Sequence, residues 1–317
     1  MSHFTVMVIT DQKPTADMLV KTLQPWHEFE CTGCNDEYIQ EIETPLSELR
    51  ADYEEHKEEG QSFLDFVHTW TGKPIVNTLT EEPDIEDENE RWGWIELGEH
   101  GAIERVINRT NPNTKWDWWK VGGRWAGFFK AKSNAESPER GEPGLMGSMR
   151  SLEGVDMVRK GDIDIEAMEK EAEEKGTLWD EIRSAVGDLD DFVSWKETLK
   201  KYLGDFDAAR TAFHKQRAMR AFKEWRDSGD DERKRKFMFI ELEDFQVTRE
   251  RYIEICRKSS IVPFAFIKEG KWVERGQMLM FGTVANESDK GTWADKVYDM
   301  IMSLPDDTWL TIIDCHI

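Results

Sequence analysis

The sequence is short of three things: cysteine, cationic side chains and long apolar runs. Its 317 residues include only 4 cysteines, too few for the disulfide framework of a small secreted protein. No apolar run approaches the roughly 20 residues that cross a bilayer. The first residues also lack the basic and apolar regions of a signal peptide. We therefore expect a cytoplasmic protein with reduced thiols.

The shortage of cations is the largest of these. The chain has 42 Lys and Arg against 65 Asp and Glu, a formal net charge of -23. Phosphate contacts need Lys and Arg to displace counterions, so this balance argues against direct binding to nucleic acid or to an anionic membrane. The 14 tryptophans are far too many for a disordered chain. The composition indicates a folded, very acidic protein.

Apolar, β-branched segments occupy both ends of the chain, at residues 3–10 and 309–317. Both are typical of buried strands, and we expect the two to share one sheet. Further strands are predicted at 237–242, 262–268 and 278–285, with a hairpin turn at Glu269-Gly270.

Apolar residues spaced along one helix face predict a helix at 293–304, stopped by Pro305. The chain therefore reads as an α+β fold, with a mixed sheet built from N- and C-terminal strands and a helical insertion or appended helical subdomain.

Composition divides the chain into four segments. Residues 1–132 form the acidic, Trp-rich N-terminal part of the α+β core, and residues 133–161 have the Gly- and Pro-rich composition of a linker. Residues 162–235 lack a strand pattern and carry helical segments separated by glycines, which predicts a helical insertion. Residues 236–317 form the C-terminal part of the core.

Charge is distributed unevenly along the chain. Residues 1–100 hold 24 acidic and 6 basic side chains, whereas residues 210–236 hold ten Lys and Arg against five acids. The most acidic stretch has seven carboxylates in ten residues: Glu81, Glu82, Asp84, Glu86, Asp87, Glu88 and Glu90. It lacks the regular Asp/Asn spacing of a calcium loop. It is either a solvated loop or a surface that competes with nucleic acid for a basic protein.

Tryptophan is concentrated at residues 116–125, next to a Gly122-Gly123 pair. One interpretation is a ligand site in which Trp118 and Trp125 stack on a base or sugar and Arg124 binds a carboxylate or phosphate. The alternative is an aromatic core in which Arg124 makes an internal ion pair. The glycine spacing matches no phosphate-binding loop.

One histidine and two cysteines, His27, Cys31 and Cys34, lie within eight residues. A structural zinc site needs four ligands, and no second C-x2-C pair follows, although His3, Cys315 and His316 stand at the two ends of the chain. The alternatives are a redox pair and structural thiols. The sequence requires no cofactor, and zinc is the metal that these residues would suit.

The sequence contains no nucleophile elbow, zinc-protease, deaminase, kinase or β-lactamase signature. Carboxylates are so abundant that no pair of them can be singled out as an acid and a base. We therefore expect a non-enzymatic protein.

Four segments carry a family resemblance: the start MSHFTV, HEFECTG at residues 27–33, GGRW at 122–125 and the ending DCHI. Together they resemble a family of uncharacterised accessory proteins of tailed bacteriophages and prophages, most weakly over 150–230. The resemblance implies a protein of the bacterial host cytosol. By analogy with inhibitors of the Gabija defence complex, it also implies an anti-defence inhibitor, and it assigns no role to any residue.

Three hypotheses follow. The first is an acidic protein that inhibits a host defence complex, or another nucleic-acid-binding protein, by covering its basic or DNA-binding surface, as in DNA mimicry. The second is a small-molecule- or nucleotide-binding protein or enzyme with a site near residues 116–125. The third is a self-assembling structural protein, a homo-oligomer whose acidic and basic segments pair between subunits.

Overall fold

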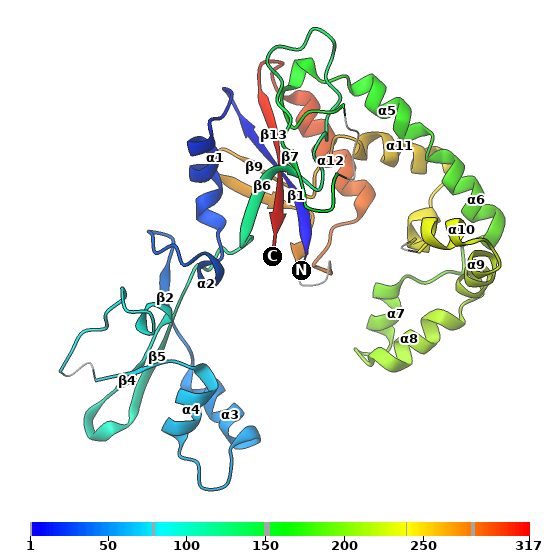
Figure 1. The fold of residues 1–317 in the computed structure, drawn as a ribbon. Coiled ribbons are helices and arrows are strands. Elements are labelled where there is room, and N and C mark those ends of the chain that lie inside the picture. The colour runs from blue at the N-terminus through cyan, green and yellow to red at the C-terminus, as the bar shows by residue number, and fades with distance from the viewer. Residues whose placement is uncertain (1, 78–79, 149–152, 239, 280–282) are drawn as a thin grey trace.

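The fold is built on one mixed sheet that contains both chain termini (Figure 1). A computed structural model describes residues 2–77, 80–148, 153–238, 240–279 and 283–317. The sheet has seven strands in the order β10-β9-β1-β13-β6-β7, with β8 also paired to β13. Their bounds are β1 His3–Thr10, β6 Trp118–Gly123, β7 Glu142–Pro143, β8 Met157–Arg159, β9 Ala265–Lys268, β10 Lys271–Glu274 and β13 Trp309–His316.

The two terminal strands pair with each other along their whole length. β1 runs antiparallel to β13, from His3 opposite His316 to Thr10 opposite Trp309, and parallel to β9 on its other side. The prediction that the termini share a sheet is confirmed, and the fold is of the α+β class.

Helices cover both faces of this sheet. Met7 and Ile9 of β1 pack with α12 (Lys290–Ser303) and α5 (Ile165–Glu173), whereas Val6 and Val8 pack with α1 (Ala16–Leu23). Neighbouring side chains of a strand point to opposite faces, so a strand covered on both sides is apolar at every position. This is why the end strands could be recognised from the sequence.

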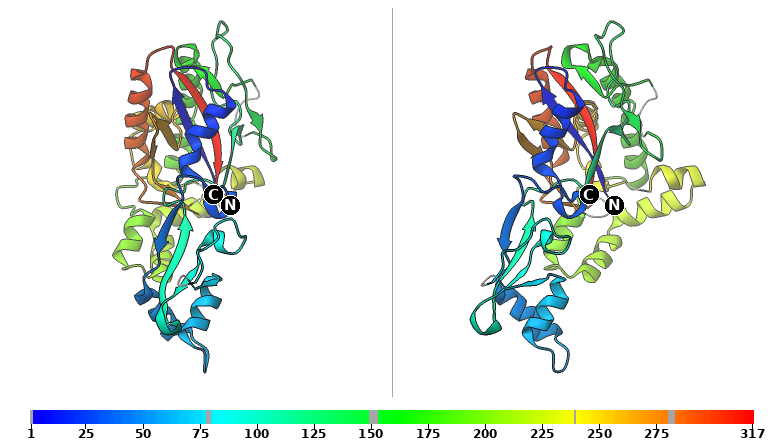
Figure 2. Two further views of the ribbon diagram at one scale, coloured as in Figure 1. Left: turned by 90° about the vertical axis from the view of Figure 1, so that its left-hand side faces the viewer. Right: turned by 60° about the vertical axis from the view of Figure 1, so that its left-hand side comes forward.

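A second sheet lies in a lobe that projects from the end of the central sheet where both termini lie (Figures 1 and 2). We call residues 40–110 the acidic lobe. Its strands are ordered β2-β5-β4-β3, and its buried core includes Leu49, Phe66, Ile95 and Val106. A short helix, α2 (Phe29–Thr32), precedes the lobe. The lobe's elements are β2 Gln40–Glu43, α3 Leu46–His56, α4 Phe63–Thr71, β3 Ile75–Val76, β4 Ile95–Leu97 and β5 Ile103–Thr110.

The helical arm, residues 165–259, lies between β8 and β9. It has its own apolar cluster, which includes Ile182, Phe222, Phe237 and Tyr252. Its helices after α5 are α6 Gly176–Val186, α7 Trp195–Lys201, α8 Phe206–Lys215, α9 Arg217–Asp227, α10 Asp231–Lys236 and α11 Arg249–Ser259.

The strand predicted at 237–242 is wrong for the described residues of that stretch, and residue 239 lies outside them. Phe237 caps the end of α10, and Leu242 begins a 3-10 helix that ends at Phe245. Phe237 and Leu242 are both buried in the cluster of the helical arm. Phe237 and Leu242 stand at the ends of two helical segments, a pattern that periodicity alone does not separate from a buried strand.

Two predictions near the C-terminus are confirmed. Glu269 and Gly270, with φ of 52° and 71°, form the tight turn between β9 and β10. α12 ends at Ser303, just before Pro305.

The strand predicted at 278–285 is a two-stranded ribbon, β11 (Gln277–Met278) with β12 (Val284–Ala285). Residues 280–282 of that prediction lie outside the described residues.

The segment boundaries differ from those predicted at two places. Residues 133–161, expected to be a linker, contain β7 and β8, and both strands pair within the central sheet. The helices extend past residue 235 to Ser259. Short strands in Gly- and Pro-rich sequence have too few residues to show an alternating pattern.

Candidate functional site

The acidic segment 81–90 lies on the surface of the acidic lobe. Its loop is held by its own chain: Asp87 Oδ1 accepts the N–H of Asn89 at 2.8 Å, and Glu90 Oε2 accepts the N–H of Asp84 at 2.6 Å. The backbone hydrogen bonds to Asp87 lower the pKa of its carboxyl. Among the described residues, no carboxylate of this segment forms an ion pair with Lys or Arg.

Three of the lobe's cations point inward and leave these carboxylates uncompensated. Lys73 Nζ donates to the carbonyl of Trp92 at 2.8 Å and to Asn108 Oδ1 at 2.9 Å, and burial lowers its pKa. Arg109, buried at 6% exposure, donates to the Arg91 carbonyl and to Asn35 Oδ1. Arg91 donates to the carbonyl of Gly33 at 2.6 Å. All of these acceptors are neutral.

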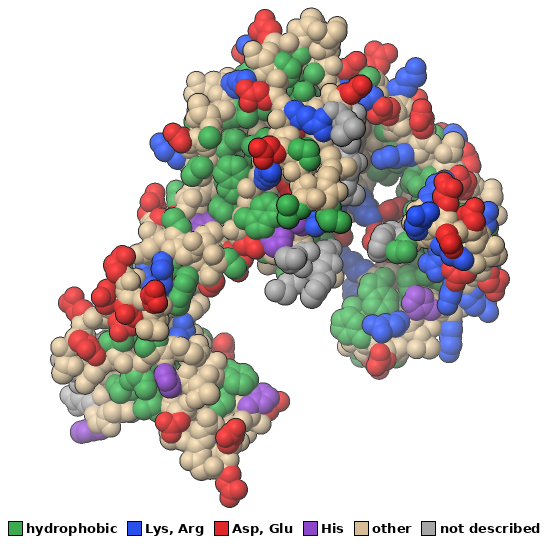
Figure 3. Space-filling model, in the orientation of Figure 1, with side chains coloured by type: hydrophobic (Ala, Val, Ile, Leu, Met, Phe, Trp, Pro, Cys, Tyr) green, Lys and Arg blue, Asp and Glu red, His purple; other side chains and the backbone are tan. Residues whose placement is uncertain are grey.

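Charge in the helical arm is arranged differently. Four cations of the basic stretch pair with carboxylates of the same arm: Arg217 with Asp191, Arg226 with Asp227, Lys234 with Asp231 and Lys236 with Glu181. Figure 3 shows blue and red side chains intermixed over the arm, whereas red predominates over blue on the lobe.

The three predicted aromatic and cationic residues of 116–125 do not form one site. Trp125 is partly buried against the core beside α12, and neighbouring Trp116 is buried and donates to the Leu23 carbonyl. Only Trp118, 42% exposed, presents a ring to the surface. Arg124 touches Asp314 through its backbone N–H, at 2.8 Å, rather than through its guanidinium.

Two buried carboxylates shape the glycine turn that follows β6. Asp314 lies so close to Gly123 that a Cβ there would stand 2.2 Å from its Oδ2. Asp156 accepts the N–H groups of Gly127, Phe128 and Gly141 at 2.8–2.9 Å. The Gly pair thus serves a close approach of backbone to carboxylate, and phosphate binding is not needed to explain it.

The most concentrated chemistry lies at the end of the central sheet where the two termini meet. His3 Nδ1 is 2.9 Å from Asp314 Oδ1, and His316 Nδ1 is 2.6 Å from Asp117 Oδ1. The two imidazole centroids are 4.8 Å apart. Trp118 stacks on His316 at 5.2 Å and meets His3 edge-on at 5.3 Å.

From the sequence, His3 and His316 are predicted only as further candidate ligands of a metal ion. A signal for their meeting was nevertheless present, because two end strands of eight residues that pair antiparallel place His3 opposite His316. The contact of His3 with Asp314 follows from the same pairing of β1 with β13. Asp117 comes just before β6, so its contact with His316 depends on the pairing of β6 with β13, which is not predicted from the sequence.

His27 is bonded to residues of its own segment. His27 is fully buried, with Nδ1 2.7 Å from Thr32 Oγ1 and Nε2 3.3 Å from Asp36 Oδ2. Both cysteines are exposed, and partial burial together with nearby carboxylates raises the pKa of each thiol. Over the described part of the chain, no three His, Cys, Asp or Glu side chains are arranged to hold a metal ion.

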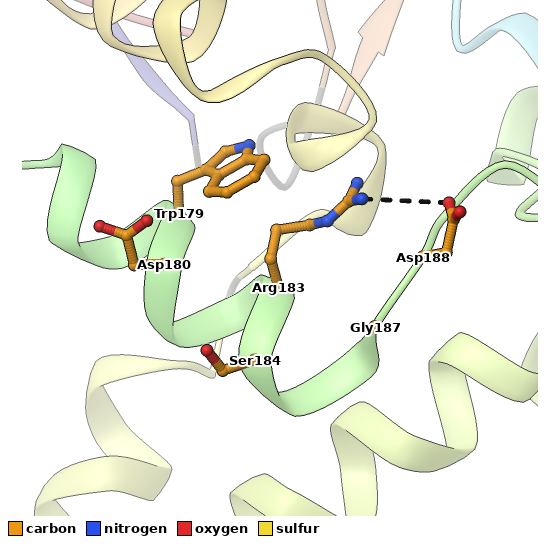
Figure 4. A pocket seen from close by; sticks show the side chains of 6 residues that line it. All are labelled: Trp179, Asp180, Arg183, Ser184, Gly187 and Asp188. Atoms are coloured by element: carbon orange, nitrogen blue, oxygen red, sulfur yellow. Dashed lines mark ion pairs between the residues drawn. The ribbon is translucent and has the colours of Figure 1, made fainter.

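The surface has two hollows among the described residues, one in the helical arm and one beside the central sheet. One, of about 380 Å³, lies along α6 of the helical arm (Figure 4), where Arg183 and Asp188 pair at 3.9 Å and Asp180 pairs with Arg249. The other, of about 660 Å³, lies at the start of α1, where Lys120 pairs with Glu142 at 2.7 Å. Neither contains a residue of the predicted sites, although Lys120 lies in the Trp-rich segment.

Within the described residues, no helix has the length and apolarity needed to cross a membrane. No family model, curated protein or solved structure matches this chain.

Proposed function

We propose that this protein is a non-enzymatic binding protein whose acidic lobe covers a basic, DNA-binding surface of another protein. In line with the phage-protein resemblance, the proposed partner is a host antiphage defence complex. The observation that carries the proposal is the uncompensated charge of the lobe. Lys57 and Arg105 are paired with other carboxylates of the lobe, but the described carboxylates of 81–90 have no cationic partner. Lys73, Arg91 and Arg109 are bonded to neutral oxygens instead.

The charge is also fixed in position. The lobe has a buried core of its own, and the loop at 81–90 is tied by hydrogen bonds to Asp87 and Glu90. Carboxylates on a preorganised surface lose little conformational freedom on binding. They attract a complementary basic surface over a distance and speed association at low salt.

The same geometry speaks against direct contact with nucleic acid. A DNA duplex would meet the unpaired carboxylates of the lobe, and like charges brought together at an interface cost several kcal/mol, on the order of 3. Part of the basic stretch is occupied by partners in the same arm, such as Glu181 for Lys236. The partner that fits the lobe is therefore a basic protein surface.

The test is capture of the partner by the tagged, full-length protein from bacterial host lysate, at about 0.05 M and about 0.5 M salt, with DNA as a competitor. We expect retention of a nucleic-acid-binding protein at low salt and its release by salt, because screening shortens the range of the attraction. DNA should compete for the same surface.

A charge-reversed variant, Glu86→Lys with Asp87→Lys and Glu88→Lys, should weaken retention by about 10-fold or more. The control reverses Glu224, Asp299 and Asp307, exposed carboxylates outside the lobe, and should retain the partner. Equal retention by both variants at all salt concentrations would contradict the proposal that the acidic lobe binds the partner.

A further inference from the structure

We propose that His3 and His316 bind a transition-metal cation of the Zn²⁺ type through their Nε2 atoms, where the two chain termini meet. This site is separate from the acidic lobe, and its test does not depend on the function proposed above. The two residues are direct neighbours across β1 and β13, and their ring centroids are 4.8 Å apart.

Each ring is held in the way that metal-binding histidines are held. His3 Nδ1 contacts Asp314 at 2.9 Å, and His316 Nδ1 contacts Asp117 through both carboxylate oxygens, at 2.6 and 2.8 Å. An ionised carboxylate only accepts hydrogen bonds, so Nδ1 carries the proton and Nε2 of the neutral ring carries the lone pair. A carboxylate behind the imidazole fixes the ring and increases its basicity as a ligand.

The spacing of the rings suits a shared ion. Two imidazoles bound to one Zn²⁺ through bonds of about 2.0–2.1 Å place their centroids roughly 5 Å apart, close to the separation observed. The side chains of His3 and His316 are only 10% and 8% exposed. Such limited access favours a small ion over an organic ligand.

The local charge also selects a cation. Asp314, 1% exposed, and Asp117, 19% exposed, lie directly behind the rings. One buried and one partly buried carboxylate would repel a phosphate or a carboxylate ligand and would balance the charge of a divalent cation. Imidazole is a ligand that suits zinc, copper and nickel ions rather than magnesium or calcium.

The protein would supply only two of the ligands of the bound ion. Since no third His, Cys, Asp or Glu of the described residues completes it, its remaining positions would be filled by water or by a group of a bound partner. Trp118 covers one face of the His316 ring and is itself 42% exposed. The structure therefore favours an exchangeable ion over a structural one.

The test uses the full-length protein after removal of metals with a chelator. Calorimetric titration of this protein with Zn²⁺ should show one binding site. Replacing His316 or His3 by Gln should weaken that site by more than about 100-fold, because losing a ligand costs more than losing its supporting partner. Asp117→Asn should weaken zinc binding by about 10- to 100-fold. The control is His56→Gln, at an exposed histidine of the lobe, which should leave zinc binding unchanged.

A second measurement does not depend on whether the variants fold. Nitrogen NMR of the wild-type imidazoles should show Zn²⁺-dependent shifts of two Nε2 atoms, assigned to His3 and His316. Unchanged nitrogen shifts at these residues would overturn the proposal. Zinc binding of equal strength in the His3, His316 and His56 variants would also overturn it.

Discussion

The acidic lobe and the helical arm carry charge in opposite ways. In the arm, cations face carboxylates across helices, as Lys236 faces Glu181 and Arg249 faces Asp180. In the lobe, Lys57 and Arg105 also face carboxylates, but Lys73 and Arg109 bond to carbonyl and amide oxygens in the interior. The number of charges therefore does not decide how a surface behaves, because cations bonded inside a fold leave carboxylates such as those of 81–90 without a partner.

Each region also has its own apolar cluster, so each can lose stability separately. Phe66 in the lobe and Phe237 in the arm are 3% and 2% exposed. Replacing either by Ala should cost about 3–5 kcal/mol, the largest effect expected here. Hydrogen exchange should show protection lost within 40–110 for Phe66→Ala and within 165–259 for Phe237→Ala. Loss of protection in β1 and β13 of the Phe66 variant would show that the lobe does not have an independent core.

A smaller effect is expected where the arm joins the sheet domain. Asp295 of α12 receives hydrogen bonds from Arg251 and Lys258 of α11, at 3.2 and 2.7 Å, and the Arg251 hydrogen bond lowers the pKa of Asp295 to about 2. Because the site is a third exposed, we expect Asp295→Asn to cost only about 1 kcal/mol at pH 7.

The pH dependence of that difference has a definite sign. A carboxyl whose folded pKa is depressed stabilises the protein above its unfolded pKa of about 3.9, and the stabilisation is lost as pH falls toward about 2. Denaturation of wild type and Asp295→Asn should therefore differ above about pH 4 and converge below it. A difference that is as large at pH 2 as at pH 7 would assign the effect to packing instead.

The smallest expected effects come from removing one exposed charge in the helical arm and one in the acidic lobe. These two substitutions should change the free energy of unfolding in opposite directions. Lys236→Gln breaks a pair with Glu181 in the arm and should destabilise by about 0.3–0.5 kcal/mol. Glu88→Gln removes an exposed charge from among like charges and should stabilise by a similar amount, about 0.3 kcal/mol. Urea denaturation of the two variants gives the signs, and a loss of stability in both would contradict the comparison.

The two end strands, one turn and the end of α12 could be predicted from the sequence. β1 and β13 are apolar at consecutive positions because both faces are covered, and that pattern needs no knowledge of the partner elements. The turn at Glu269-Gly270 and the end of α12 depend on local preferences, so they were also predictable. The stretch 237–242 was misread because six residues are too few to separate a strand from two buried helix ends.

The net charge, its concentration in the first hundred residues and the two end strands follow from the amino-acid sequence, because they depend on composition and on local periodicity. Which carboxylates stay unpaired, and the meeting of His3 and His316 between Asp314 and Asp117, depend on the folded arrangement of the strands. Residues 311 positions apart come together only when β1 and β13 pair. Whether a cation neutralises the surface depends on which carbonyl or carboxylate the fold brings within hydrogen-bonding distance.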